Sequence, residues 1–238
     1  MVTYIETLDF GRVRVIKRRG SRSMRIAVSQ TGEVRLSIPY RISTDDGIKF
    51  LNEKKNWIIK HKSEPTYLED GAQIGNNHTL KILVSKNSKT TSKIIGNQII
   101  VNMPEDTMID DVQKKLEQIS KKLLKNEAES VLPQKIKSLA NEHGYKIRDV
   151  SIKPLQSRWG SCSTEGDIVL NSFLMQLPYD LVLYVMFHEL AHTLHHNHGD
   201  GFWNEVKKNI PDYKNKKVLL KKYPTKIFDM RESARFVS

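Results

Sequence analysis

The sequence predicts an α+β protein, with an antiparallel β-rich N-terminal domain followed by a domain built on helices and a small antiparallel sheet. Two observations predict it. Up to residue 104, short runs of β-forming residues alternate with turn-forming residues. From residue 105 onward, apolar residues recur every three or four positions, as on helices. We therefore expect one domain at residues 1–104 and a second at residues 105–238.

The N-terminal domain begins with three expected antiparallel strands, at residues 13–16, 24–28 and 34–38, which turn-forming residues separate. Ser43 or Thr44 can cap a helix that follows them. More strands are expected between residues 69 and 101, and the Gly96-Asn97 pair predicts a tight hairpin there. The sequence shows no evident internal repeat.

The second domain begins with a helical pattern from residue 106 to residue 143. Pro133 lies inside it and is expected to kink or split it, giving two helices, because proline lacks a backbone N–H and clashes with the preceding turn. Strands are then expected at residues 147–152, 155–162 and 166–171, before the next helix. Beyond residue 214 the chain is basic and mixed, and we expect a loose end.

That next helix carries the most informative motif of the chain. Seven consecutive apolar residues, 181–187, predict a buried helix, and His-Glu-Leu-Ala-His follows at once. On a helix, residues four apart share a face, so His188 and His192 can reach one Zn²⁺ while Glu189 leans toward the water that such an ion polarises. The motif predicts metal-assisted hydrolysis with Glu189 as the catalytic group.

A catalytic zinc site needs a third protein ligand and one open position. His195, His196 and His198 compete for this role, and we expect His198, because Asn197 and Gly199 beside it can supply the turn that brings it back toward the helix. Asp200 and Glu205 remain alternative ligands.

The strand pair before the helix is the expected place for an extended substrate, because a peptide can add to a sheet edge as a further strand. Arg158, Trp159 and Gly160 lie in it. Arg158 could hold a carbonyl or carboxylate, and Gly160 permits close backbone approach. The competing interpretation is that Trp159 belongs to the core and Arg158 pairs with an acid.

The chain is strongly basic, with a formal net charge of +12. Residues 1–62 hold 14 Lys and Arg against 6 Asp and Glu, so the excess is concentrated at the front. Arg18, Arg19, Arg22 and Arg25 lie on or beside a predicted hairpin and could contact nucleic-acid phosphates. They are equally compatible with solvated turn charges.

Composition also bears on the compartment. No apolar run approaches the roughly 18 residues of a membrane span, and no secretory signal is visible at the N-terminus. A single cysteine suits a reducing compartment. We expect a cytoplasmic protein without a membrane partner, and the sequence leaves the oligomeric state open.

In its combination of motifs the sequence resembles the YgjP-like metallopeptidase family, relatives of the SprT-like zincins. The resemblance is carried by residues 158–163, 168–171, Pro178, 184–185, 188–192, 197–198, 202–203 and 211–213, and more weakly by residues 22–25, Gly32, Val34, Pro39 and 57–58. It implies a zincin-like peptidase domain in which His188, His192 and His198 bind Zn²⁺ and Glu189 is the catalytic acid/base. SprT-like relatives cut proteins crosslinked to DNA, which by analogy alone would suit a basic front half.

The favoured hypothesis is therefore a zinc metallopeptidase that acts on a peptide or protein, with DNA-associated proteins as a candidate substrate class. An alternative is a nucleic-acid-binding protein whose zinc is structural, although such sites usually have four ligands with cysteine prominent. A third is an inert scaffold descended from a hydrolase.

Overall fold

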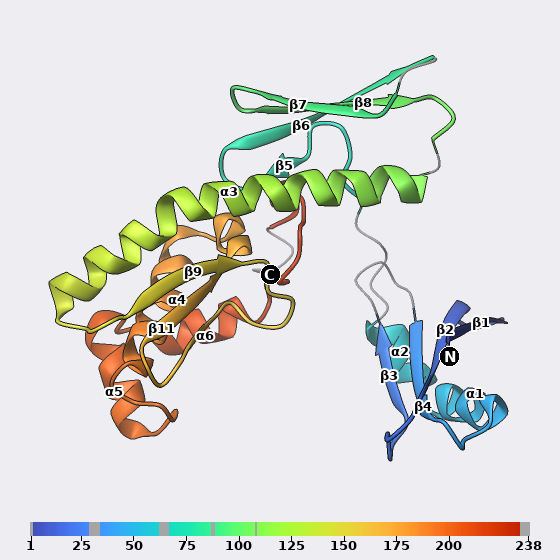
Figure 1. The fold of residues 1–238 in the computed structure, drawn as a ribbon, viewed down its shortest axis with the longest axis horizontal. Coiled ribbons are helices and arrows are strands. Elements are labelled where there is room, and N and C mark those ends of the chain that lie inside the picture. The colour runs from blue at the N-terminus through green and yellow to red at the C-terminus, as the bar shows by residue number, and fades with distance from the viewer. Residues whose placement is uncertain (1, 29–33, 62–66, 87–88, 108, 234–238) are drawn as a thin grey trace. The chain divides into compact units, whose positions relative to one another are not determined.

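The computed structural model describes residues 2–28, 34–61, 67–86, 89–107 and 109–233 (Figure 1). It mixes helices and small sheets, which agrees with the expected α+β class. The chain divides into two compact units, Met1–Tyr67 and Leu68–Ser238. This boundary precedes the one expected near residue 105, because the strands between residues 68 and 104 bury their apolar side chains against a helix of the second unit.

Unit 1 contains a four-stranded sheet of order β1-β2-β4-β3, formed by β1 (Val2–Thr7), β2 (Gly11–Arg18), β3 (Arg25–Val28) and β4 (Val34–Pro39). The expected purely antiparallel arrangement is wrong at its centre, where β2 and β4 are parallel. The reason is that β3 and β4 pair antiparallel and β4 inserts between β3 and β2. The short local patterns did not encode that insertion.

Two helices, α1 (Thr44–Glu53) and α2 (Lys55–His61), complete unit 1. Ser43 caps α1 as expected, since its Oγ accepts a hydrogen bond from the Asp46 backbone N at 3.0 Å. Leu51 of α1 and Ile58 of α2 are fully buried and pack in one cluster with alternate residues of β2 and β4. The helices therefore cover one face of the sheet.

Unit 2 begins with a second four-stranded sheet, of order β5-β6-β8-β7, formed by β5 (Gln73–Ile74), β6 (His78–Ser85), β7 (Thr91–Ile95) and β8 (Gln98–Pro104). Its strand directions repeat those of the first sheet: an antiparallel pair, a parallel central pair and another antiparallel pair. The parallel register ends at a proline in both sheets, Pro39 and Pro104. The structure thus shows a repeat that the sequence did not, because strand order is repeated and residue identity is not.

Helix α3 (Ile109–His143) joins the two parts of unit 2. Its first half, through Leu116 and Leu124, packs on the sheet of β5 to β8, and its second half, through Leu132 and Ile136, packs in the core around the next helix (Figure 1). The expected split at Pro133 does not occur. Burial on both sides of Pro133 offsets a proline penalty of about 3 kcal/mol.

The remaining elements surround helix α4 (Tyr179–His192). Strands β9 (Asp149–Lys153), β10 (Gly160–Cys162) and β11 (Asp167–Asn171) form a sheet of order β10-β11-β9, and β9 pairs parallel with β11. The strand expected from residue 155 begins only at 160, because the Asn171 side chain holds the Leu155 and Arg158 carbonyls in a loop, each at 2.8 Å.

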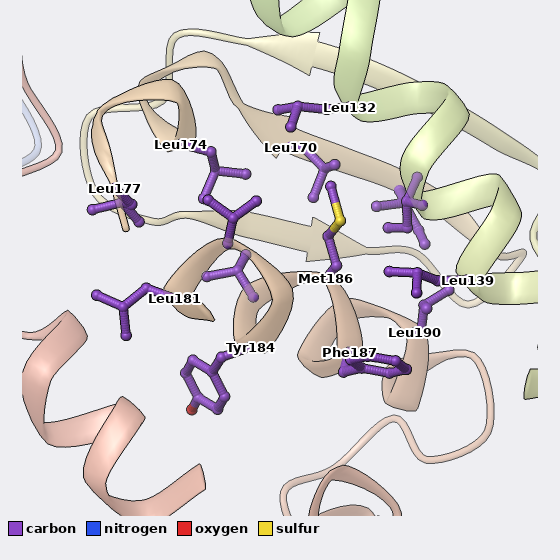
Figure 2. Close-up of a cluster of buried hydrophobic side chains, with 14 of the residues drawn as sticks. Leu132, Leu139, Leu170, Leu174, Leu177, Leu181, Tyr184, Met186, Phe187 and Leu190 are labelled. Atoms are coloured by element: carbon purple, nitrogen blue, oxygen red, sulfur yellow. The ribbon is translucent and has the colours of Figure 1, made fainter. Parts of the chain in front are cut away.

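Figure 2 shows part of the apolar core of unit 2, where Met186 and Leu190 of α4 meet Leu170 of β11 and Leu139 of α3. Four short elements follow or flank this core: the 3₁₀ helices η1 (Ser172–Gln176) and η2 (Met230–Glu232), α5 (Asp200–Asn209) and α6 (Tyr213–Leu220). The site therefore rests on a closely packed apolar layer.

Up to residue 233, the segment after α6 packs on the rest of unit 2 and is not loose, contrary to expectation. The final residues of that prediction, 234–238, lie outside the described part of the chain. Tyr223 and Phe228 are buried in the unit 2 core, and Asp229 Oδ1 accepts a hydrogen bond from the Gln73 backbone N at 2.9 Å. No helix among the described residues combines the length and apolarity that crossing a membrane requires.

Candidate metal centre

Helix α4 positions the residues of the candidate site. Its apolar residues, including Leu181, Val185 and Met186, are buried in the unit 2 core, which fixes the rotation of the helix. Glu189 is also buried, with only 4% of its surface exposed. His188 and His192, four residues apart, lie at the partly exposed surface of the same helix.

Three imidazoles gather at the end of α4. Each of His188, His192 and His198 offers a nitrogen, and these three nitrogens lie within 4.8 Å of one another. The Nε2 atoms of His188 and His198 are 3.1 Å apart. Two nitrogens bound to one tetrahedral Zn²⁺ at roughly 2.0–2.1 Å would be separated by about 3.3 Å. The observed spacing therefore fits a shared ion.

The chain turns back between α4 and α5, and that turn orients His192. The Nδ1 atom of His192 lies 3.0 Å from the His195 carbonyl oxygen. Nδ1–H can donate to this carbonyl, which leaves the Nε2 lone pair of His192 for a metal. His195 thus contributes its backbone to the site, while its ring is outside the cluster.

An aromatic wall supports the three histidines. The Phe202 ring, 1% exposed, lies 4.8, 4.5 and 4.6 Å from the rings of His188, His192 and His198. Trp203 stacks on His198 at 5.6 Å. Both aromatics come from the first turn of α5, so the helix that follows the chain reversal also fixes the third imidazole.

The wall continues into α6, where Tyr213 stacks on Trp203 with 5.1 Å between ring centroids. The Lys217 ammonium lies 4.1 Å from the centroid of the same indole ring. Sequence reasoning missed Lys217, because its contact depends on how α5 and α6 pack.

Burial sets the protonation of this site. Desolvation, followed by the neighbouring His192, His198 and Lys217, lowers the pKa of His188 to about 3. The pKa of His192 is also lowered, first by desolvation. Both rings are therefore neutral near pH 7, which is the form that binds a metal.

Glu189 has the opposite shift. Desolvation raises its pKa to about 8, although the Arg158 charge acts in the other direction. Its Oε2 is buried without a hydrogen-bond partner in the described part of the chain. A carboxyl group that is desolvated and incompletely hydrogen-bonded is suited to accept and return a proton near neutral pH.

Gly160 brings the edge strand β10 against Glu189. A Cβ atom at position 160 would lie 2.6 Å from Glu189 Oε1 and 2.8 Å from its Cδ. Any larger residue would therefore displace the carboxylate or the strand. The sequence marked Gly160 as a place of close backbone approach, but it could not show that the partner is Glu189.

The other residues predicted for the site lie outside the group of three histidines. Arg158 is exposed, and Trp159 is half-buried and packs against two apolar clusters of unit 2. Asp200 is exposed on the first turn of α5. Glu205 is hydrogen-bonded elsewhere, to the Tyr145 hydroxyl at 2.8 Å and to Lys208 Nζ at 2.5 Å. Neither alternative third ligand joins the group of three histidines.

Cys162 lies on β10 but outside the histidine cluster. Burial raises the pKa of its thiol to about 11, with further contributions from Glu189 and Asp167. A thiol in this state is a poor metal ligand or nucleophile near pH 7.

The four arginines predicted to contact nucleic acid belong to unit 1. Arg18 ends β2, Arg25 begins β3, and Arg22 is exposed in the connection between them. The Arg19 guanidinium lies 5.2 Å from the Tyr40 ring centroid. They do not form one cluster on a hairpin tip, since β2 and β3 are not neighbours in the sheet.

Fold and site together define a protein of the metallopeptidase class, with a helix-borne His-Glu-x-x-His pair and a third histidine on a small α+β scaffold. Residues 22–223 match the model of the YgjP-like metallopeptidase domain, and the chain belongs to this family, as its sequence motifs indicated.

The solved structure described as the "metallopeptidase zymogen of Pyrococcus abyssi abylysin" matches with 28% identity, over 36% of this chain and 90% of that one, with a TM-score of 0.33. The comparison with curated proteins gives no match.

Proposed function

We propose that this chain is a zinc-dependent peptidase in which His188, His192 and His198 hold the ion and Glu189 is the general base and acid. The observation that carries the proposal is the convergence of three imidazole nitrogens, two of them on the helix that also carries a buried carboxyl group. Three nitrogen ligands that leave a position open are the donor set of catalytic zinc.

The ion, when bound, would supply a Lewis acid that lowers the pKa of a coordinated water to about 7 and polarises the scissile carbonyl. In its ionised form, Glu189 would accept a proton from the attacking water and pass it to the leaving amine. Gly160 keeps the carboxylate in place by leaving room for it.

The edge of β10 is the proposed place for the peptide substrate. This strand pairs with β11 on one side and is the edge of its sheet on the other. A peptide in extended form can pair with such an edge while its scissile bond lies over the site. The proposed contacts of Arg158, Trp159 and Gly160 with substrate follow from this placement.

The test separates metal binding from chemistry. Zinc content is measured by mass spectrometry of the purified protein, and cleavage is followed with a proteome-derived peptide library, which covers an unidentified sequence preference. We expect one zinc per chain and zinc-dependent cleavage. His198→Ala should lose zinc, and Glu189→Gln should keep zinc but lose cleavage.

Matched controls come from the same tract. His196→Ala removes an exposed histidine outside the cluster, and Asp200→Asn and Glu205→Gln remove the alternative ligands. All three should keep zinc and cleavage. Cleavage retained by Glu189→Gln, or zinc retained by His198→Ala and lost by Asp200→Asn or Glu205→Gln, would contradict the proposed roles.

The alternative with a structural zinc has less support. The one candidate metal group found among the described residues has three imidazoles and no thiol, whereas structural sites are normally closed by four ligands. Action on DNA-associated proteins and a cytoplasmic location stay predictions from the sequence.

A further inference from the structure

The sheet of unit 1 has one face that no described element of the unit covers. Residues alternate between the two faces of a strand, and Val13 and Val15 of β2 and Leu36 of β4 lie against helices α1 and α2. Arg12 and Arg14 of β2 therefore lie on the opposite face. We call this opposite face, defined by the outward residues of β1 to β4, the open face.

The strand registers arrange arginines in rows across this face. Arg14 is opposite Tyr4 on one side and Arg35 on the other. Neighbouring strands are about 4.8 Å apart, and alternate residues along a strand are about 6.6 Å apart. The registers place five arginines on the open face: Arg12, Arg14, Arg18, Arg25 and Arg35.

Negative charge is sparse on the same face. Among the described strand residues, the registers place one acid there, Glu6, opposite Arg12. The Nε atom of Arg14 is buried and meets no hydrogen-bond acceptor among the residues that the structure describes. Because a guanidinium donor that is partly removed from water favours an anionic acceptor, the centre of the face is suited to bind an anion.

The face also offers surfaces for stacking. Tyr4 is 46% exposed, and the Arg12 guanidinium lies 4.2 Å from the centroid of its ring. Planar guanidinium groups and aromatic rings both stack on nucleobases. A duplex groove admits a helix or a two-stranded ribbon, whereas the splayed bases of a single strand can lie across the face of a sheet.

We propose that the open face of unit 1 binds single-stranded nucleic acid, with phosphates held by Arg14, Arg35 and their neighbours and a base stacked at Tyr4. The arginine rows give the charge complementarity, and the exposed aromatic distinguishes a nucleic acid from a simple polyanion. The site lies within unit 1 and is independent of the hydrolytic chemistry proposed for unit 2.

The experiment measures binding of the full-length chain to a fluorescent oligonucleotide of single-stranded DNA by anisotropy, across a salt series. For single strands, log K falls with log salt by about 0.7 for each phosphate contact. Arg14→Gln together with Arg35→Gln should reduce the slope by about 1.4 and weaken binding about 20-fold at about 0.1 M salt. Tyr4→Leu should weaken binding at least about fivefold with little change in slope.

The matched control is Lys115→Gln together with Lys122→Gln on α3, which removes the same net charge from exposed positions of unit 2. It should bind like the wild type. Circular dichroism melting verifies that every variant is folded. The proposal is overturned if the arginine variant binds like this control, if a duplex of the same length binds more tightly, or if Tyr4→Leu has no effect and heparin competes equally well.

Discussion

The two four-stranded sheets of this chain share a strand order and a pattern of directions, yet they present different faces to solvent. In unit 1 the open face carries five arginines around one exposed tyrosine. In unit 2 the strand registers place two lysines on the corresponding face, Lys81 and Lys93, on either side of Ile100, so this face holds fewer charged side chains and is more apolar at its centre. One backbone arrangement thus supports two surfaces, and the residues at alternate strand positions decide which surface results.

The cores behind the sheets differ as well. The unit 1 sheet packs on two short helices of its own, whereas the unit 2 sheet packs on α3, whose far half supports the metal centre. The ionisable groups follow the same division. Three of the groups proposed for chemistry, His188, Glu189 and His192, are desolvated in unit 2, whereas the arginines proposed for association are spread over one face of the unit 1 sheet. The following predictions test whether the two functions are separable.

The largest effect is expected for Glu189→Gln. Because it removes the proposed general base and acid, peptide cleavage should fall by about 10²- to 10⁴-fold. Zinc content and oligonucleotide affinity should stay unchanged, since the ligands and unit 1 are untouched. Steady-state cleavage, zinc analysis and anisotropy of one preparation check all three. A parallel loss of oligonucleotide binding would show that the division is wrong.

The stability of the metal-free protein should depend on pH through Glu189. Its pKa is raised from 4.5 to about 8 in the folded chain, so between these values the folded state holds a proton that the unfolded state has released. The free energy of unfolding should therefore fall as pH rises through this window, by up to about 1.4 kcal/mol per pH unit.

Urea denaturation with a chelator present, at several values between pH 5 and pH 8, measures this slope. His188 acts in the opposite direction, because its lowered pKa costs stability as pH falls below 6.5. The difference between wild type and Glu189→Gln isolates the carboxyl group. Equal slopes for the two proteins would contradict the burial argument.

A smaller effect is expected for Gly160→Ala. The added Cβ would meet Glu189 Oε1 at 2.6 Å, so the carboxylate must move. A displacement of about 1 Å can cost about 10²-fold in rate. The reduction should appear in kcat, with zinc content unchanged. Gly166→Ala, on the neighbouring turn, is an unsuitable control because Gly166 has a φ of 84°; Ser161→Ala on the same strand is the matched one.

The smallest effect on cleavage is expected for Gly47→Ala in α1. A Cβ at this position would lie 2.8 Å from Leu36 Cδ2, so the Leu36 side chain or α1 must shift. Overpacking of this kind costs about 1–3 kcal/mol. Unit 1 should melt earlier by calorimetry, while zinc binding and cleavage by unit 2 persist. A parallel loss of cleavage would mean that the two units are not separable.

The sequence by itself determined the helix-borne part of the site. The spacing of His188, Glu189 and His192 could be interpreted from the sequence alone, because a helix places residues four apart on one face in any fold. The choice of His198 relied on an expected chain reversal, and the structure brings this residue beside the other two. The cap of α1 at Ser43 could be predicted for the same reason, because it joins residues only three positions apart in the sequence.

Only the tertiary structure decided what depends on distant pairing. The insertion of β4 between β2 and β3 made the central pair parallel. It also placed Arg14 directly beside Arg35, which is 21 positions further along the sequence. The packing of β10 on α4 brought Gly160 against Glu189. Burial of both halves of α3 kept this helix continuous at Pro133. Local periodicity reports which face of an element is buried, whereas long-range packing decides which other element buries it.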